Sequence, residues 1–266
     1  MARVLITGCS SGIGRATAEY LAGVGHHVIA TARNLDSLQG LHVAQCLALD
    51  VRDAASVAAA VSAAGDIDVL VNNAGVAVWA PLELAPMPEV ERLFDTNVLG
   101  VIRMCQAVLP RMRARGEGRI IQISSGAARR PQPGVGLYCA SKAALEAFSM
   151  ATRIEMRAFG VDVCVVSMGA TASELDRNRF VASGEGTDYA PMMNLIIERT
   201  RAVRGAAQSG ETVARVVQDM ILAERPPFRT YVGEDYAKSV EAMAHMSDTD
   251  FEDKVFATIR DAMPGA

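Results

Sequence analysis

Short apolar segments alternate with segments of helical periodicity along most of this chain, from residue 3 to residue 232. The apolar segments are rich in Val and Ile and are bounded by Gly, Asn and Ser, which is typical of buried strands. Because a helical crossover joins each strand to the next, the strands should run parallel. The sequence therefore predicts an α/β fold with a parallel, doubly wound sheet. The strands are expected at residues 3–7, 27–32, 46–49, 67–71, 118–124, 161–167 and 228–232.

The composition fits such a sheet and argues against several functional classes. Half of the 266 residues are hydrophobic but only 5% are aromatic, as expected where helices pack closely on a parallel sheet. The net charge is −4 and the Arg residues are interspersed with acids, so we expect no nucleic-acid partner. No apolar run reaches the roughly 18 residues of a transmembrane helix, so we expect no membrane span.

The cysteines indicate a reducing compartment. The five cysteines are odd in number and evenly spread, and neither they nor the four histidines have metal-ligand spacing. We therefore interpret them as reduced thiols of a cytoplasmic protein and expect no metal site. The N-terminus enters a strand almost at once, so we also expect no signal peptide.

No repeat, low-complexity run or linker divides the chain, and we expect one domain over residues 1–266. Residues 171–210 are polar and irregular, which is typical of a mobile lid over a binding site. The C-terminal tail, residues 235–266, has an acidic, helical pattern to which the sequence assigns no task.

A glycine-rich turn follows the first expected strand and precedes a helix. Its spacing, G-x-x-x-G-x-G, lets the backbone approach a pyrophosphate, and the helix N-terminus adds N–H groups and a positive dipole end. The alternative is an ordinary tight turn between a strand and a helix. We predict a dinucleotide site that includes Gly8, Ser10, Ser11, Gly12, Ile13 and Gly14.

The end of the second expected strand indicates which dinucleotide binds. An NAD-specific site would carry an acid here to bind the ribose 2′-hydroxyl. Ala32 and Arg33 stand at this point instead. Arg33 can bind a 2′-phosphate through two parallel hydrogen bonds, so we predict NADP(H) rather than NAD(H). The alternative is that Arg33 is a solvated loop residue.

Polar or small residues also follow the other strands. Residues 72–75 (NNAG) come directly after the fourth strand, where the amides could hold a turn and contact a ribose, or form an ordinary Asn turn. Ligands of doubly wound sheets bind beyond the carboxyl ends of the strands, so residues at those ends should share one site. These residues are Gly8 to Gly14, Arg33, Asp50, Asn73, Ala74, Gly75, Ser125 and Gly169.

Tyr138 and Lys142 lie four residues apart in a helix-forming segment, which places both side chains on one helix face. A free tyrosine has a pKa of about 10, and a neighbouring cation lowers it, which makes the phenol a better proton donor. Ser125 precedes the loop before this helix, where its hydroxyl could hydrogen-bond the reacting oxygen. The alternative is a half-exposed tyrosine beside a solvated lysine. Asn97, inside a helix expected over residues 89–113, could hold a water, bend the helix or simply be exposed.

In combination, these motifs resemble those of the short-chain dehydrogenase/reductase family, and the resemblance covers residues 3–232. Residues 7–14 (TGCSSGIG) are similar to the family's TGxxxGIG cofactor loop, and residues 72–75 match its NNAG turn. The resemblance implies a seven-stranded Rossmann sheet, a nicotinamide cofactor, and a homodimer or homotetramer.

The catalytic residues of the family also have counterparts here. By this resemblance, Tyr138 is the general acid/base, and Lys142 binds the nicotinamide ribose and lowers the pKa of Tyr138. Ser125 positions the substrate oxygen, and Asn97 holds a proton-relay water.

Cofactor contacts are implied in the same way. Asp50 and Val51 would contact adenine, and Ser11 and Ile13 would line the phosphates. Arg33 matches the basic residue of NADP(H)-preferring members, and its surroundings resemble the reductase and hydroxysteroid dehydrogenase branches.

The chain departs from the family at Met168, where proline is common before glycine. Proline would fix the backbone where it turns beneath the nicotinamide, whereas methionine leaves the turn freer. Gly169 would still contact the cofactor, and the hydroxyl that follows could belong to Thr171 or Ser173.

The sequence thus predicts an NADP(H)-dependent oxidoreductase that interconverts a carbonyl and an alcohol. The expected pocket wall is mostly apolar, which favours a hydrophobic small-molecule substrate, although Arg129 and Arg130 could meet a charged group or be solvated. The alternative is a sensor or scaffold that binds NADP(H) without chemistry, but such proteins usually lack the Tyr or the Lys. The wall is expected to include Trp79, Ala127, Val135, Met168 and Leu175.

Overall fold

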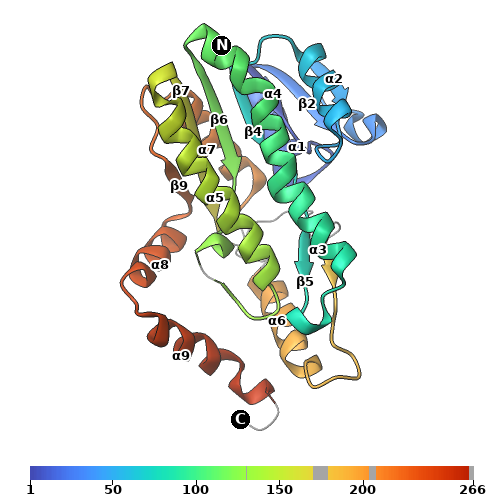
Figure 1. Ribbon diagram of the computed structural model, residues 1–266, viewed down its shortest axis with the longest axis vertical. Coiled ribbons are helices and arrows are strands. Elements are labelled where there is room, and N and C mark those ends of the chain that lie inside the picture. The colour runs from blue at the N-terminus through green and yellow to red at the C-terminus, as the bar shows by residue number, and fades with distance from the viewer. Residues whose placement is uncertain (130, 170–178, 204–207, 264–266) are drawn as a thin grey trace.

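A twisted parallel sheet with helices on both faces forms the body of the protein (Figure 1). The computed structural model describes residues 1–129, 131–169, 179–203 and 208–263. The sheet has seven strands in the order β3-β2-β1-β4-β6-β7-β9, and every pair is parallel, so the predicted doubly wound fold is confirmed. The strands are β1 (Arg3–Ile6), β2 (His27–Ala32), β3 (Gln45–Ala48), β4 (Val69–Asn72), β6 (Gly118–Ile123), β7 (Val161–Met168) and β9 (Arg229–Val232).

Successive side chains of each strand pack against opposite helix layers. In β1, Val4 and Ile6 belong to one buried cluster and Leu5 belongs to the other. The strands are therefore apolar almost continuously, as buried parallel strands require. The first cluster is covered by α1 (Gly12–Gly23) and α7 (Gly210–Leu222). The second is covered by α2 (Ala54–Ala64), α4 (Gly100–Arg115) and α5 (Gly136–Met156).

The helix expected over residues 89–113 contains an irregular turn. It consists of α3 (Met87–Phe94), a π-helical turn (Asp95–Leu99) and then α4. A π turn shifts the hydrogen-bond register by one residue and is frequent at functional sites. The sequence offered three alternatives for Asn97: it could hold a water, bend the helix or be exposed. The irregular turn agrees best with the second.

A small second sheet lies outside the main one and was not predicted. Its parallel strands are β5 (Ala77–Trp79) and β8 (Arg179–Val181). Next along the chain is α6 (Ala190–Val203), which lies within the expected lid segment. Residues 170–178 and 204–207 lie outside the described residues, so a lid over 171–210 stays a prediction.

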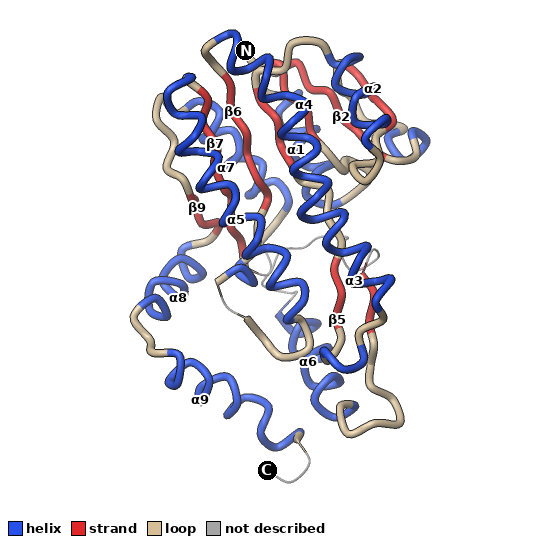
Figure 2. The backbone as a smooth tube through the Cα atoms, in the orientation of Figure 1, coloured by secondary structure: helices blue, strands red, loops and turns tan. Residues whose placement is uncertain are grey.

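The C-terminal tail forms an arm of two helices, α8 (Glu234–Ala244) and α9 (Asp248–Ile259), and we call these residues the C-terminal arm. Figure 2 shows the arm leaving the sheet at β9 and extending away from the layers of the body. Its far end returns to α6, because Ile259 packs with Met192 and Met193 in one buried cluster. Among the described residues, no helix is both long and apolar enough to cross a membrane.

Candidate active site

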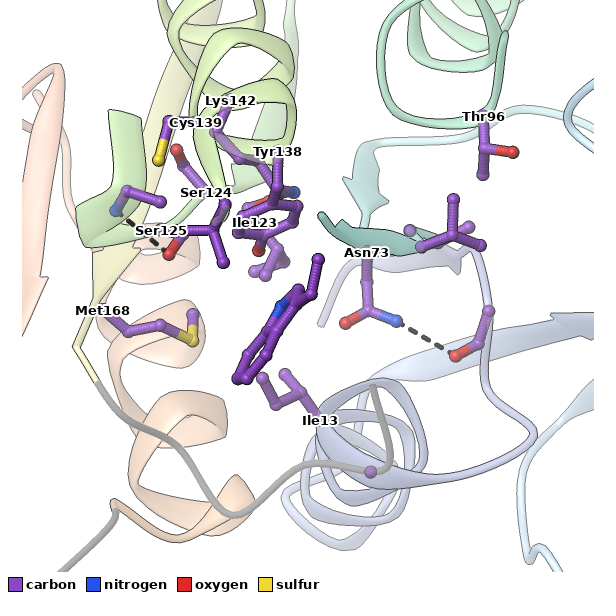
Figure 3. A pocket seen from close by; sticks show the side chains of 18 of the residues that line it. Ile13, Asn73, Thr96, Ile123, Ser124, Ser125, Tyr138, Cys139, Lys142 and Met168 are labelled. Atoms are coloured by element: carbon purple, nitrogen blue, oxygen red, sulfur yellow. Dashed lines mark hydrogen bonds between the residues drawn. The ribbon is translucent and has the colours of Figure 1, made fainter. Parts of the chain in front are cut away.

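A cavity of about 720 Å³ opens at the carboxyl ends of the strands, and the predicted site residues converge on it (Figure 3). The structure therefore brings together residues that are up to about 160 positions apart in the sequence. Asn97 does not line the cavity, and Thr171 and Ser173 lie outside the described residues. The predicted residues that line it are Gly8, Ser10, Ser11, Gly12, Ile13, Gly14, Arg33, Asp50, Val51, Asn73, Ala74, Gly75, Ser125, Tyr138, Lys142 and Gly169.

The glycine loop after β1 has the geometry of an anion-binding cradle. Gly8 and Gly12 have φ values of +74° and +58°, which favour glycine. A Cβ on Gly14 would lie 2.2 Å from the carbonyl oxygen of Gly8, so no side chain fits there. The Ser11 side chain makes no capping hydrogen bond to α1, which leaves the first-turn N–H groups without this side-chain partner. These features fit a dinucleotide pyrophosphate.

The turn after β4 holds the glycine loop in place. The side-chain amide of Asn73 donates to the carbonyl oxygens of Thr7 and Gly8, at 2.9 and 3.0 Å. In return, the Thr7 hydroxyl accepts hydrogen bonds from the backbone N–H groups of Asn73 and Ala74, both at 3.0 Å. The Asn73 amide thus holds the turn, as one sequence interpretation expected, and Gly75 remains at the cavity surface.

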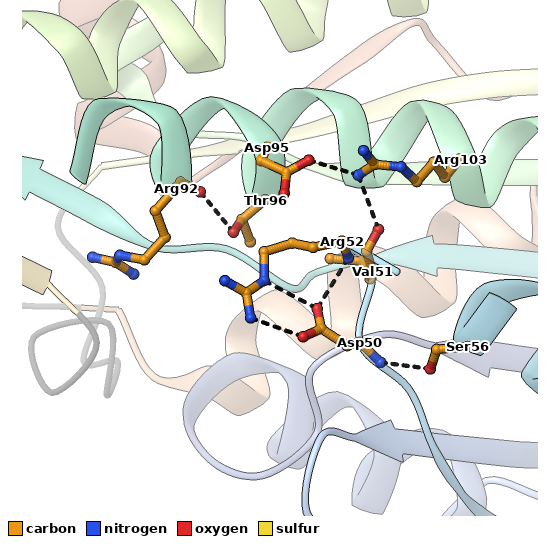
Figure 4. A network of polar contacts seen from close by, with 8 residues as sticks. All are labelled: Asp50, Val51, Arg52, Ser56, Arg92, Asp95, Thr96 and Arg103. Atoms are coloured by element: carbon orange, nitrogen blue, oxygen red, sulfur yellow. Dashed lines mark hydrogen bonds and ion pairs between the residues drawn. The ribbon is translucent and has the colours of Figure 1, made fainter. Parts of the chain in front are cut away.

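The far end of the cavity is rich in arginine. Arg33 is exposed after β2, with Asp50 nearby after β3. Asp50 accepts hydrogen bonds from both Nε and Nη2 of Arg52, at 3.2 and 2.9 Å (Figure 4). These bonds, with smaller contributions from the charges of Arg52 and Arg33, lower the pKa of Asp50, so this carboxylate is already neutralised by a partner. Arg33 has no such partner in the described part of the chain.

Ser125 and Tyr138 meet at the centre of the cavity. Tyr138 lies in the first turn of α5, and Ser125 precedes a short 3-10 turn, where its hydroxyl accepts a hydrogen bond from the N–H of Ala127 at 3.2 Å. Ser125 also hydrogen-bonds the Tyr138 hydroxyl. Burial nevertheless raises the pKa of Tyr138 to about 12, and the Ser125 bond offsets only part of this.

Lys142 lies one turn further along α5, with its ammonium buried behind the tyrosine ring. Its Nζ is 6.0 Å from the ring centroid of Tyr138 and donates to the carbonyl oxygen of Ile123 at 2.9 Å. Burial lowers the pKa of Lys142 to about 8, against a smaller opposing effect of the Glu146 charge. The sequence predicted that Lys142 would lower the pKa of Tyr138. The net pKa of Tyr138 is raised, because loss of hydration disfavours the charged forms of both groups, and the separate effect of Lys142 on the tyrosine stays a prediction.

Asn97 is buried and acts through its side chain on the backbone. Its Oδ1 accepts from the N–H of Val76 and its Nδ2 donates to the Val76 carbonyl, both at 2.9 Å. Nδ2 also donates to Ser141 Oγ at 3.1 Å, and the Ser141 hydroxyl donates to the Tyr138 carbonyl at 2.7 Å. Both N–H groups of the amide are occupied, and the amide links the turn after β4 to the first turn of α5. That Asn97 holds a proton-relay water stays a prediction.

Sequence reasoning missed Glu146. This residue is 5% exposed, although it is charged, and it accepts hydrogen bonds from the hydroxyl of Ser124 at 2.8 Å and from Nη2 of Arg229 at 2.6 Å. Its position four residues after Lys142, on the same helix face, was a readable signal. Arg129 lies 3.7 Å from the same carboxylate, with half of its side chain exposed, and Arg130 lies outside the described residues.

The expected apolar wall is largely present, and three further elements complete it. Trp79, Ala127, Val135 and Met168 line the cavity, whereas Leu175 lies outside the described residues. The additional lining comes from α6 and from both helices of the C-terminal arm. These residues were not predicted, and they are Ile196, Arg199, Thr200, Tyr236, Thr258 and Ile259. Within the described chain, no three His, Cys, Asp or Glu side chains cluster as metal ligands would.

The conserved pattern of a known family covers most of this fold. The family model described as short chain dehydrogenase matches residues 2–183, which include the glycine loop, the turn after β4 and the Ser125, Tyr138 and Lys142 cluster. The chain belongs to the short-chain dehydrogenase family. It is therefore an oxidoreductase that interconverts a carbonyl and an alcohol.

Several proteins resemble this short-chain dehydrogenase over most of their length. The 3-ketodihydrosphingosine reductase of Bacteroides thetaiotaomicron is 37% identical, with 86% of this chain and 87% of that protein covered. Estradiol 17-beta-dehydrogenase 1 of Rattus norvegicus is 43% identical, with 84% of this chain and 70% of that protein covered.

Solved structures agree with the assignment of the chain to the short-chain dehydrogenase family. A short-chain dehydrogenase from Streptomyces avermitilis superposes with a TM-score of 0.80 at 30% identity, covering 98% of this chain and 96% of that chain. The closed form of serine dehydrogenase complexed with NADP+ superposes with a TM-score of 0.75, also at 30% identity, covering 86% of this chain and 93% of that chain.

Proposed function

We propose that this short-chain dehydrogenase is an NADP(H)-dependent reductase of hydrophobic carbonyl compounds, with Tyr138 as the proton donor. The observation that carries the proposal is the meeting of Ser125, Tyr138 and Lys142 in the cavity that the glycine loop also lines. The glycine loop and the turn after β4 would hold the dinucleotide, as their backbone geometry supports.

Each polar side chain has a distinct task in the proposed reaction. The reduced nicotinamide, when bound, supplies a hydride to the carbonyl carbon. The Tyr138 hydroxyl gives its proton to the carbonyl oxygen as that oxygen becomes an alkoxide. Because burial raises the pKa of Tyr138 to about 12, the phenol carries this proton throughout the neutral range, as reduction requires. The Ser125 hydroxyl, next to the phenol, orients the substrate oxygen by a hydrogen bond.

Lys142 stabilises the phenolate that the proton transfer leaves. A cation near the ring favours the charged form of the tyrosine, and this attraction operates once the phenolate exists. The hydrogen bond from Nζ to the Ile123 carbonyl fixes where the cation stands. Because the pKa of Lys142 is about 8, the lysine is largely charged at neutral pH and loses this charge in mildly alkaline solution.

The preference for NADP(H) rests on charges after β2 and β3. Arg33 lines the cavity without an ion-pair partner in the described chain, whereas the nearby acid, Asp50, is bound by Arg52. A ribose 2′-phosphate would meet an unpaired guanidinium rather than a carboxylate. Arg33→Asp should therefore shift the ratio of kcat/KM for NADPH over NADH towards NADH, by about a hundredfold if Arg33 forms two charge-assisted hydrogen bonds. Arg225→Asp, at an exposed position between α7 and β9 and outside the cavity, is the control, and an unchanged ratio in Arg33→Asp would reject the preference.

The substrate proposed is an apolar ketone or aldehyde. Trp79, Val135 and Met168 form an apolar wall, so burial of apolar surface would contribute most of the binding energy. Arg199 also lines the cavity and has no ion-pair partner in the described part of the chain, so a matched pair of ketones with and without a carboxylate belongs in the test. The experiment follows NADPH oxidation across such a panel. Cofactor binding without turnover of any ketone or aldehyde would contradict the proposed reaction.

We also propose that two copies of the chain associate through α5. Its outer face exposes small and apolar side chains at helical spacing, a pattern that a second copy could cover without large cavities. The stripe comprises Ala140, Ala143, Ala147, Met150, Ala151 and Ile154, of which Ile154 is 69% exposed. Figure 1 shows α5 beside α4 in the outer helix layer, and the exposure of the stripe residues places them on the side of α5 that faces away from the sheet.

A further inference from the structure

Tyr236 joins the C-terminal arm to the centre of the cavity. It lies in the first turn of α8 and lines the cavity, although it is about a hundred positions after Tyr138 in the sequence. Its hydroxyl is 3.0 Å from the hydroxyl of Ser167, which is completely buried near the end of β7. The ring is also held from the side, because Tyr231 of β9 meets it edge-on, with centroids 5.6 Å apart.

The Tyr236 ring occupies space that two glycines leave open. A Cβ on Gly126 would lie 2.8 Å from Cε2 and from the hydroxyl oxygen of Tyr236, closer than real Cβ contacts. A Cβ on Gly169 would lie 3.3 Å from Cγ and Cδ2 of the same ring. Gly126 directly follows Ser125, and Gly169 directly follows Met168. One aromatic ring thus packs against both the Ser125 loop and the turn after β7.

We propose that Tyr236 is a positioning residue that braces the turn at Met168 and Gly169, where the sequence lacks a proline. Proline restricts φ of its own residue, whereas a packed ring restricts the turn from outside. Because Met168 provides no such restriction, the ring and its hydrogen bond to Ser167 supply it. The inference rests on the proposed cofactor site, since this turn would lie beneath the nicotinamide.

The arrangement has a consequence for the Ser125 loop. The same ring that contacts Gly169 contacts Gly126, so a displacement of α8 would move both walls of the cavity together. The sequence assigned no task to the C-terminal arm. By this arrangement, the arm fixes the distance between the Ser125 loop and the turn after β7. Tyr236 acts through these neighbours and need not touch the reacting atoms.

The first test is a double-mutant cycle between Gly126→Ala and Tyr236→Ala, read as the Kd for NADPH and the KM for a ketone substrate. Each single variant should weaken NADPH binding by about tenfold, since residues in direct contact couple at this level. The double variant should be no weaker than Tyr236→Ala, because the added methyl then has no ring to strike. Effects that multiply in the double variant would overturn the proposal.

The second test asks whether proline replaces the brace. Met168→Pro should change NADPH binding less than about twofold in the natural chain but restore most of the loss in Tyr236→Ala. Failure of Met168→Pro to restore any binding in Tyr236→Ala, at equal Tm, would contradict the proposed brace. Tyr236→Phe keeps the ring and should lose less affinity for NADPH than Tyr236→Ala. This conservative variant keeps the comparison possible if Tyr236→Ala does not fold.

A matched control and a prior measurement separate this inference from the proposed function. Phe256→Ala removes a partly exposed ring of the same arm, on α9, and should leave the Kd for NADPH unchanged. If the natural chain itself does not bind NADPH, the proposed function fails before the brace is tested. If the natural chain binds NADPH and Tyr236→Ala binds it equally well, only the brace is rejected.

Discussion

Lys142 is a residue whose burial is costly for the fold, and its position is explained by the chemistry proposed for it. Its side chain is 7% exposed, and the Ile123 carbonyl is its hydrogen-bond acceptor in the described chain. Burying an ammonium that lacks a directly bonded carboxylate disfavours the charged form, which lowers the pKa of Lys142 to about 8. Glu146 is close enough to oppose this effect, but its carboxylate bonds Ser124 and Arg229.

The lowered pKa of Lys142 predicts how stability depends on pH. An unfolded lysine has a pKa of about 10.4, so between about pH 8 and pH 10.4 the unfolded chain binds more protons than the folded one, and this residue makes stability rise with pH. Lys142→Met removes the titration. The free energy of unfolding of the natural chain should therefore rise by about 3 kcal/mol relative to that of the variant between pH 7 and pH 10.5.

The measurement is urea unfolding of both proteins at several pH values. Lys238→Met, at an exposed site of α8, is the control. Its free energy of unfolding should change with pH in the same way as that of the natural chain. Parallel curves for Lys142→Met and the natural chain would show that the pKa of Lys142 is not lowered.

At the scale of elements, the glycine loop and α1 form one unit that is pinned by the turn after β4. A Cβ on Gly14 would strike the Gly8 carbonyl at 2.2 Å and the Asn73 side-chain amide at 2.4 Å, so Gly14→Ala must displace the loop from this turn. We expect Gly14→Ala to abolish measurable NADPH binding and to lower stability by about 2 kcal/mol or more. Binding is measured by titration calorimetry and stability by urea unfolding.

The same helix provides the control. Gly23 ends α1 with no neighbouring atom within 4 Å of a built Cβ, so Gly23→Ala should bind NADPH normally and change stability by less than about 1 kcal/mol. Retained NADPH binding in Gly14→Ala would show that this loop is not the cofactor cradle.

The regular elements were predictable because their signals are local. Each strand of the main sheet shows an apolar run, and the glycine loop shows its spacing within seven residues of the sequence. The β5 and β8 pair has no comparable signal, since each strand has three residues and their pairing joins positions about 100 apart. The role of Asn97 was likewise hidden, because its partner Val76 lies 21 residues earlier in the chain.

The pKa of Tyr138 illustrates a second limit. Spacing on a helix places an ammonium near a phenol, but the pKa depends on how much water both have lost, and burial is a property of the whole fold. The contribution of the C-terminal arm to the cavity was hidden for a related reason. Tyr236 and Ile259 reach the site only because β9 returns the chain to the sheet edge beside β7.

For the whole molecule, the apolar stripe on α5 predicts the state of association. Ala147→Glu would place a charge in the middle of the proposed contact and should convert the dimer, or a tetramer that contains it, to smaller species. The measurement is light scattering coupled to size-exclusion chromatography. Leu222→Glu, on an exposed site of α7 that belongs to the other helix layer, is the control. A natural chain that is monomeric at micromolar concentration, or an unchanged mass in Ala147→Glu, would contradict this contact.

The whole account depends on a buried phenol that gives its proton to a carbonyl oxygen beside a nicotinamide cofactor. Tyr138→Phe removes the hydroxyl and keeps the ring that packs in the cavity, so it isolates this step. We predict that kcat for NADPH-dependent reduction of a ketone falls by a factor of about 10³ or more, while the Kd for NADPH changes less than about threefold. Turnover close to that of the natural chain in Tyr138→Phe, with NADPH still bound, would contradict the account.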